Sequence, residues 1–194
     1  MSGWWLASYV VLWVITATMF VVLLVVLRQL GLMYVRGGGA PRLEEGPPIG
    51  AIIPPFEEME DGTQAEIRFP DAVVDLNLLL FTSPHCRICE EVLRELGGVT
   101  RDFDARVLVV SEGDVEENGR LRQLVDGGAR FVSNAERQRS LDVRTHPYGL
   151  VTDRSGTVLE KGVVNGSRDV QVLLEEAARS SVTAGPPGRA EGGG

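Results

Sequence analysis

The stretch that decides the fold of this chain is Leu76-Asn-Leu-Leu-Leu-Phe-Thr-Ser-Pro-His-Cys-Arg-Ile-Cys89. Its first part, Leu76 to Phe81, is a largely apolar run with the length of a buried strand, and Ser83-Pro84 breaks that run. The residues that follow, Glu90 to Leu96, have the pattern of a helix. Strand, turn, Cys-x-x-Cys and helix, in this order, are the arrangement that thiol–disulfide exchange requires.

Cys86 and Cys89 are the only cysteines among the 194 residues. We expect Cys86 at the N-terminus of the helix, where unpaired backbone N–H groups and the helix dipole favour a thiolate. Cys89 follows three residues later on the same helix face, close enough to form a disulfide with Cys86. A single pair excludes a four-cysteine zinc site within one chain. Metal binding and an inert disulfide are the weaker alternatives, and redox chemistry is the favoured interpretation, with Cys86 as the attacking thiol and Cys89 as the resolving one.

A long apolar segment near the N-terminus predicts a membrane anchor. Residues Trp4 to Leu27 contain no charged side chain, and a helix of that length covers about 36 Å, enough to cross a hydrocarbon core of about 30 Å. Trp4 and Trp5 suit one membrane interface and Arg28 the other. The alternative is a cleaved signal peptide, but the basic segment before the run and a small-residue cleavage site after it are missing. We therefore expect an uncleaved single-pass helix over residues 4–27.

Charge is distributed unevenly along the chain. Arg28, Arg36 and Arg42 follow the apolar segment, and no acidic residue precedes Glu44. Taken by itself, the positive-inside rule places the C-terminal part in the cytoplasm. The whole chain has 19 basic and 27 acidic residues, so the part beyond the anchor is acidic, which argues against nucleic acid and anionic lipid surfaces as partners. Lys161 is the only lysine, which we interpret as a compositional bias.

Glycine and proline divide the remainder into a tether, one domain and a tail. Gly37–Pro41 and Gly46–Pro48 interrupt any helix, so we expect a flexible tether over residues 28–48. Residues 49–179 have the length of a single domain. Residues 180–194 are rich in glycine and have little to bury, and we expect a disordered tail there.

Strand-like and helix-like segments alternate within the domain. Gly97-Gly98 marks the end of the cysteine helix, and Ser167 caps the last helix. A mostly parallel sheet that ends in an antiparallel hairpin, with helices on both faces, is a three-layer α/β domain with a central mixed sheet. We expect extended segments at 54–69 (a hairpin), 76–82, 106–111, 129–132, 148–152 and 157–163, and helices at 86–97, 115–125, 134–141 and 167–179.

This order of elements resembles the thioredoxin-like fold. In that family a proline directly before the terminal hairpin is cis and faces the active-site disulfide. Here that proline is Pro147, which follows His146 and precedes Tyr148. The resemblance implies that the backbone around His146 and Pro147 binds an extended substrate by strand pairing, and that Pro147 keeps the cysteines from binding a metal.

Three shorter stretches, Arg28–Leu32, Gly46–Gly50 and Leu80–Cys86, resemble the membrane-anchored methylamine-utilisation disulfide oxidoreductases, the MauD type. This resemblance implies a protein thiol–disulfide oxidoreductase that needs no cofactor beyond its redox-active disulfide, Cys86–Cys89. It implies a protein substrate with thiols or a disulfide, such as the small subunit of an amine dehydrogenase, and a membrane or thiol electron-transfer partner. It also implies an extracytoplasmic domain, which we expect here against the distribution of the arginines.

The chain departs from typical thioredoxins near the cysteines. His85 stands where they have tryptophan, and Leu80 stands where they have a buried aspartate, so the usual proton acceptor for the second thiol is absent. Arg87 either adds a cation that favours the Cys86 thiolate or is an ordinary surface arginine. These departures leave the direction of electron flow open.

Two alternative functions remain for these residues. The chain's only histidines, His85 and His146, would form a copper or zinc transfer site if both converged with Cys86 and Cys89. His85 otherwise stabilises the Cys86 thiolate or lies on the surface. Known copper-delivery relatives use Cys-x-x-x-Cys, which this chain lacks, so we predict no metal site. The second alternative is a disulfide reductase for cytochrome c maturation or for general thiol reduction.

Overall fold

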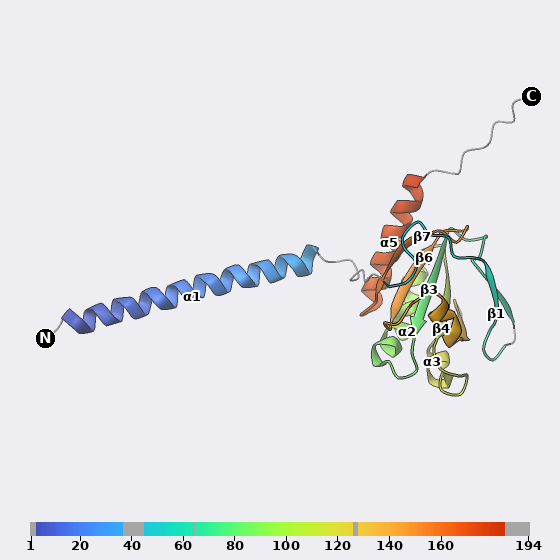
Figure 1. The fold of residues 1–194 in the computed structure, drawn as a ribbon, viewed down its shortest axis with the longest axis horizontal. Helices are drawn as coiled ribbons and strands as arrows, with labels where there is room; N and C mark the ends of the chain where they lie inside the picture. The colour runs from blue at the N-terminus through green and yellow to red at the C-terminus, as the bar shows by residue number, and fades with distance from the viewer. Residues whose placement is uncertain (1–2, 37–44, 64, 126–127, 185–194) are drawn as a thin grey trace, which may run out of the picture. The chain divides into compact units, whose positions relative to one another are not determined.

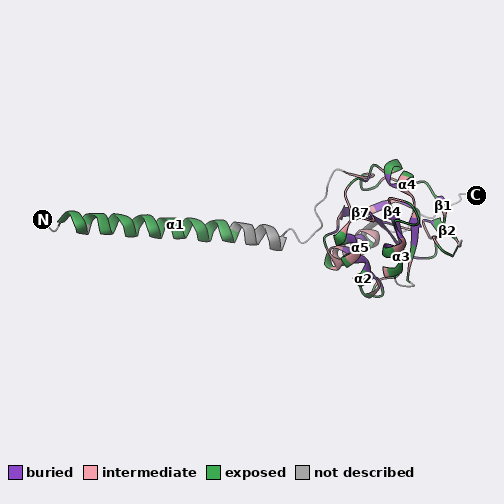
Figure 2. Cartoon of the chain, turned by 90° about the horizontal axis from the view of Figure 1, so that it is seen from below, coloured by how far each residue is buried: buried purple, intermediate pink, exposed green. Residues whose placement is uncertain are grey.

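A computed structural model describes residues 3–36, 45–63, 65–125 and 128–184 of the chain (Figure 1). The chain divides into two units, residues 1–38 and 39–194, which we describe separately. The described residues of the first unit form one helix, α1 (Gly3–Arg36). Its stretch Gly3–Arg28 is long and apolar enough to cross a membrane, and the described side chains of this stretch are exposed (Figure 2).

The second unit contains a five-stranded mixed sheet with the strand order β5-β4-β3-β6-β7. Strands β3, β4 and β5 run parallel to one another, β6 runs antiparallel to β3, and β7 runs antiparallel to β6. This arrangement is the parallel sheet with an antiparallel hairpin that the sequence predicts. The strands are β3 (Leu76–Thr82), β4 (Ala105–Ser111), β5 (Ala129–Ser133), β6 (Tyr148–Thr152) and β7 (Val158–Val163).

Helices and a hairpin cover the two faces of this sheet. One face carries α2 (Arg87–Thr100), α3 (Gly119–Leu124) and α5 (Ser167–Ala184), and the other carries α4 (Ala135–Ser140) with the hairpin of β1 (Phe56–Met59) and β2 (Glu66–Phe69). Helix α4 therefore lies on the opposite side of the strands from α2, α3 and α5 (Figure 2).

Strand β3 is at the centre of the sheet and is buried at all seven positions. Its alternate side chains enter different apolar clusters: Leu78 and Leu80 contact the α2 and α5 side, while Leu79 and Phe81 contact the α4 and hairpin side. Each fully buried side chain of this size stabilises the fold by about 1.5–3 kcal/mol. A largely apolar run without alternation is therefore what a strand covered on both faces requires.

Three helix boundaries in the domain differ from the sequence prediction by three residues or more. Helix α2 continues through Gly97-Gly98 to Thr100, because Leu96 and Thr100 are buried and Thr100 Oγ1 donates to the Leu96 carbonyl. Helix α3 begins at Gly119 rather than at 115, since the Asp114 carboxylate accepts the backbone N–H groups at 116 and 117 and holds a turn there. Helix α5 extends past 179 to Ala184, into the region expected to be the tail.

The expected tether over residues 28–48 is also corrected at both ends. Residues 28–36 continue helix α1, and the segment from Glu45 to Pro48 is part of the domain. The Gly46 N–H donates to the Asp142 carbonyl at 3.2 Å, and Lys161 Nζ donates to the carbonyls of Glu45 and Gly46. The rest of the tether, 37–44, and the rest of the tail, 185–194, lie outside the described residues.

Two glycines are expected to respond to alanine with opposite signs. A Cβ at Gly149 in β6 would lie 2.8 Å from Leu173 Cδ1 and 3.2 Å from Val164 Cγ2, so Gly149→Ala should destabilise the domain by about 1–3 kcal/mol. A Cβ at Gly98 in α2 would meet nothing within 4 Å, so Gly98→Ala should stabilise it by about 0.5–1 kcal/mol. Urea unfolding followed by far-ultraviolet circular dichroism measures both, and a loss of stability in Gly98→Ala would contradict the helical assignment at the glycine pair.

Candidate active site

The two cysteines form a disulfide at the beginning of α2, with their Cα atoms 5.2 Å apart. Cys86 is the N-cap of the helix, and its Sγ accepts the backbone N–H of Cys89 at 3.1 Å. The Cys86 sulfur therefore lies where the helix dipole and a backbone donor both favour negative charge. Cys86 is partly exposed and Cys89 is fully buried, which leaves Cys86 as the accessible sulfur.

The residues beside the disulfide lie mostly on the surface. His85 is exposed. The Arg87 side chain is 92% exposed and forms a long ion pair of 3.7 Å with Glu91, an interaction that contributes little in water. Its surroundings are those of an ordinary surface arginine, one of the two alternatives that the sequence left open.

The strand beneath α2 carries an apolar side chain at the position where typical thioredoxins have an acid. Leu80 is fully buried in the same cluster as Val92 and Leu93 of α2. Two residues further, on the same face of β3, the buried hydroxyl of Thr82 has no hydrogen-bond partner. The polar atom that this strand places on the α2 face near its end is therefore a neutral hydroxyl, and no carboxylate takes its place.

Pro147 lies at the same edge of the sheet as the disulfide. The His146–Pro147 peptide bond is cis, as the resemblance implies for this position. Tyr148, the next residue, pairs with Phe81 near the end of β3, and β3 leads through Ser83-Pro84 to Cys86. The sheet therefore brings the cis-proline loop beside the segment that carries the disulfide.

A buried glutamine fixes the His146 ring. Gln138 Nε2 donates to the carbonyls of Thr82 at 2.9 Å and Val110 at 2.7 Å, so its Oε1 is left as an acceptor for His146 Nε2 at 2.8 Å. This hydrogen-bond pattern assigns the ring proton to Nε2 and leaves a lone pair on Nδ1. Nδ1 lies 3.9 Å from Glu112 Oε1.

The surroundings of His146 keep its ring neutral near pH 7. Burial lowers the pKa of His146, while the carboxylates of Glu112 and Glu45 act in the opposite direction and only partly offset the burial. A neutral ring with a free Nδ1 can accept a proton, and it lies next to the cis-proline.

Three proteins named methylamine utilization protein MauD are similar along most of the chain. The one from Methylorubrum extorquens is 32% identical over 174 residues, or 88% of this chain and 85% of the relative. Those from Paracoccus versutus and Paracoccus denitrificans are each 31% identical, and cover 88% and 90% of this chain and 87% and 90% of their own lengths. The chain belongs to the MauD family. No protein-family model matches it.

Solved structures agree on the fold. The thioredoxin domain of a thiol-disulfide oxidoreductase from Bacteroides vulgatus superposes with a TM-score of 0.56 at 14% identity, covering 66% of this chain and 97% of that domain. The dsbF protein of MTB, solved in mixed oxidised and reduced forms, gives a TM-score of 0.54 at 15% identity and covers 64% of this chain and 94% of its own. The domain has the thioredoxin-like fold, as the sequence predicts.

The four residues proposed for metal transfer do not come together. Within the described parts of the chain, no group of three or more His, Cys, Asp or Glu side chains is placed to hold a metal ion. His146 is instead bonded to Gln138 and His85 is exposed, while the two cysteines are joined to each other. The convergence on which the metal alternative depends is therefore not found.

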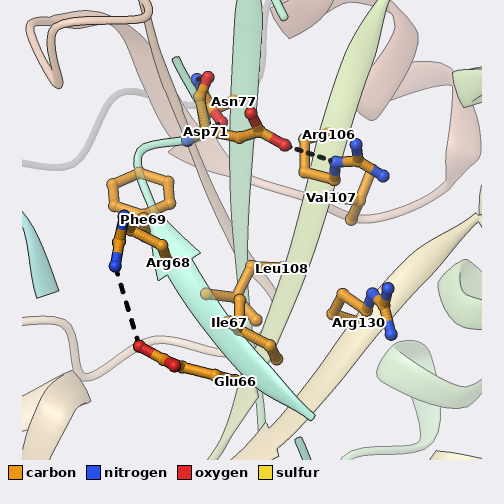
Figure 3. Close-up of a pocket in the computed structure, with 10 residues that line it drawn as sticks. All are labelled: Glu66, Ile67, Arg68, Phe69, Asp71, Asn77, Arg106, Val107, Leu108 and Arg130. Atoms are coloured by element: carbon orange, nitrogen blue, oxygen red, sulfur yellow. Dashed lines mark hydrogen bonds and ion pairs between the residues drawn. The ribbon is translucent and has the colours of Figure 1, made fainter. Parts of the chain in front are cut away.

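A separate polar pocket of about 150 Å³ lies toward the other end of the central strands (Figure 3). Asn77, near the start of β3, lines it, whereas the disulfide follows the end of that strand. The arginines that line it are paired with acids: Arg68 with Glu57 at 2.8 Å, Arg106 with Asp71 at 3.0 Å, and Arg130 with Glu60 at 2.6 Å. None of the residues that the sequence marks as functional lines this pocket, and we assign it no role in exchange.

Sequence reasoning missed two residues of this site, Gln138 and Glu45. Gln138 lies in a short helix with no motif around it, and Glu45 lies in a segment predicted to be a flexible tether. Glu45 accepts hydrogen bonds from Thr145, which directly precedes His146. The only lysine of the chain was the one sequence signal that could have pointed to the segment around Glu45, because Lys161 is buried against the carbonyls of Glu45 and Gly46.

Gln138→Leu is expected to destabilise the domain by about 3 kcal/mol. The change removes the hydrogen bonds of Gln138 to two buried carbonyls, of which that of Thr82 keeps the Glu112 N–H as a donor, and it leaves the His146 N–H without its acceptor. A lost hydrogen bond costs about 0.5–1.5 kcal/mol, and a buried group without any partner costs about 1–3 kcal/mol. The matched control is Gln123→Leu in α3, because Gln123 is exposed and should change stability by less than about 0.5 kcal/mol. Equal losses in the two variants, measured by urea unfolding, would show that the Gln138 network contributes nothing specific.

Proposed function

We propose that this protein is a membrane-tethered thiol–disulfide oxidoreductase that forms or maintains disulfides in an extracytoplasmic partner protein. The observation that carries the proposal is the Cys86–Cys89 disulfide at a helix N-terminus, with a cis-proline at the adjoining strand end. Methylamine utilization proteins named MauD match 88% to 90% of the chain. This similarity favours a partner such as the small subunit of an amine dehydrogenase over the cytochrome c maturation alternative.

Residues 4–27 of α1 serve as the anchor in this proposal, and the catalytic domain follows from Glu45 to Ala184. Two properties support the anchor: its length and its apolar character without any acidic or basic side chain. The extracytoplasmic location is supported by the family, since a disulfide that must persist in a partner suits an oxidising compartment.

The exchange reaction uses Cys86 first. When the protein acts as an oxidant, a substrate thiolate attacks Cys86 Sγ, the Cys86–Cys89 bond breaks, and Cys89 leaves as a thiolate that takes up a proton. A second substrate thiolate then attacks the mixed disulfide, releases Cys86 as a thiolate and leaves the substrate oxidised. The electron-transfer partner reoxidises the pair. In the reducing direction, the Cys86 thiolate attacks a substrate disulfide and Cys89 resolves the intermediate.

The loop before β6 supplies the substrate side of the site. The backbone beside Pro147 offers pairing groups to an extended substrate segment. We assign to His146 Nδ1, whose lone pair the hydrogen bond to Gln138 leaves free, the role of accepting the proton of an incoming substrate thiol. His85, exposed next to Cys86, has a modulating role.

The thiol assignment predicts unequal trapping by two variants. Cys89→Ser should accumulate mixed disulfides with substrate, because Cys86 can still attack and nothing completes the exchange. Cys86→Ser should accumulate roughly tenfold fewer, since Cys89 is buried and farther from the helix N-terminus. Non-reducing gels with mass spectrometry of the trapped species measure both. Equal trapping by the two variants, or none by either, would reject the assignment.

The membrane proposal predicts the location of a reporter fused after Ala184. A reporter that is active only outside the cytoplasm should be active, and one that is active only in the cytoplasm should be silent. Full-length protein should also sediment with membranes and retain its N-terminus. The reverse reporter pattern would place the domain in the cytoplasm, as the arginines after the helix alone would suggest, while leaving the anchor intact.

A further inference from the structure

Glu45 and Gly46 are fastened to the domain by a set of contacts that we name the Glu45 clasp. It consists of Glu45 and Gly46 together with three residues that bind them, Thr145, Tyr148 and Lys161. These three come from the cis-proline loop, β6 and β7. A segment that composition predicts to be a free tether is therefore joined to the strands that border the active site.

The carboxylate of Glu45 binds the loop that leads into the cis-proline. It accepts the Thr145 N–H and the Thr145 hydroxyl, each at 3.0 Å, and the Arg144 N–H at 3.4 Å. Hydrogen bonds to an ionised carboxylate are stronger than those between neutral groups. The conformation of the backbone immediately before His146 and Pro147 therefore depends on this one side chain.

The backbone of Glu45 is held from the other side by buried donors. Its carbonyl accepts Tyr148 Oη at 2.8 Å and Lys161 Nζ at 2.7 Å, and the Gly46 carbonyl accepts Lys161 Nζ at 3.1 Å. Tyr148 is fully buried and Lys161 is 9% exposed. A buried ammonium needs such acceptors. Burial and the Glu45 carboxylate raise the pKa of Tyr148 to about 12, so its hydroxyl remains a donor.

We propose that Glu45 is a positioning residue for disulfide exchange, which holds the cis-proline loop in the conformation that receives an extended substrate. The inference rests on the proposed function, because it concerns the substrate side of the same site. The hydrogen bonds of the Glu45 carboxylate go to Thr145 and to the Arg144 N–H, so it acts on the backbone that leads into Pro147. Its loss should therefore affect substrates that pair with that backbone and spare small thiols that do not.

The test compares two substrates in three versions of the full-length protein in detergent. Glu45→Ala removes the carboxylate, and Glu57→Ala is the matched control, because Glu57 is an exposed acid on β1 paired with Arg68 at 2.8 Å. With a reduced, extended cysteine peptide, Glu45→Ala should raise KM roughly tenfold with a smaller change in kcat. With dithiothreitol, its rate should stay within about twofold of wild type. Glu57→Ala should match wild type with both.

The reactivity of Lys161 reports whether the clasp is formed, because Lys161 belongs to the clasp and is the only lysine in the chain. Acylation by an amine-reactive ester, located by mass spectrometry, should be slow at Lys161 in wild type and faster in Glu45→Ala. Faster acylation with an unchanged KM for the peptide would overturn the proposal, since the clasp would open without affecting the substrate. Unchanged acylation together with unchanged KM would overturn it as well.

A second measurement applies if Glu45→Ala fails to fold. Cys89→Ser protein keeps the clasp. Forming a mixed disulfide between it and the peptide should slow acylation of Lys161, because substrate bound to the cis-proline loop stabilises the contacts of that loop with Glu45 and so keeps Lys161 covered. Equal rates with and without the peptide would reject the positioning role. Failure of the proposed function has a different signature: wild type itself would transfer no disulfide to the peptide, although dithiothreitol would still reduce it.

Discussion

The position of the disulfide depends on the burial of one strand, β3. All seven of its residues are buried, and their side chains alternate between the two apolar clusters. A strand covered on both faces cannot move along its axis without disturbing both close-packed layers. Its end therefore has a fixed place in the domain, and the short turn from Thr82 to Cys86 transfers this order to the N-terminus of α2.

The edge of the sheet where β3 ends is organised by polar contacts. The apolar run stops there, and the backbone carbonyls that it leaves buried need donors. Gln138 supplies two of these donors and, with its remaining oxygen, sets the tautomer of His146. On the outer side of the cis-proline loop, Glu45 performs the same task for the N–H groups before His146. The same side chains therefore form hydrogen bonds with buried backbone groups and order the candidate site.

The distribution of titratable groups differs from that of typical thioredoxins. Beneath α2 the strand carries Leu80 and a neutral Thr82, so the buried Cys89 has no carboxylate from this strand. On the cis-proline side lies His146, whose pKa is lowered by burial and raised in part by the carboxylates of Glu112 and Glu45. Proton transfer during exchange is therefore expected from the side on which the substrate binds, in keeping with the proposed role of His146.

Local patterns were sufficient for the elements that carry the chemistry. The strand before the cysteines, the helix after them, the terminal hairpin and the apolar N-terminal helix all begin within one residue of the predicted positions, because apolar runs and helix breakers act on neighbouring residues. The predicted C-terminus of α2 and the predicted N-terminus of α3 were wrong, because side-chain contacts outweighed local preference there. Burial of Leu96 and Thr100 extends α2 past two glycines, and the turn at Asp114 makes α3 begin later in the chain.

The sequence by itself determined that this chain has a Cys-x-x-Cys pair in a thioredoxin-like domain that follows one apolar helix along the chain. Only the tertiary structure decided what surrounds that pair. Gln138 bonds a carbonyl 56 residues away, and Glu45 bonds a loop 100 residues away. Hydrogen bonds across such separations depend on the path of the whole chain, and no periodicity or spacing of neighbouring residues can mark them in advance.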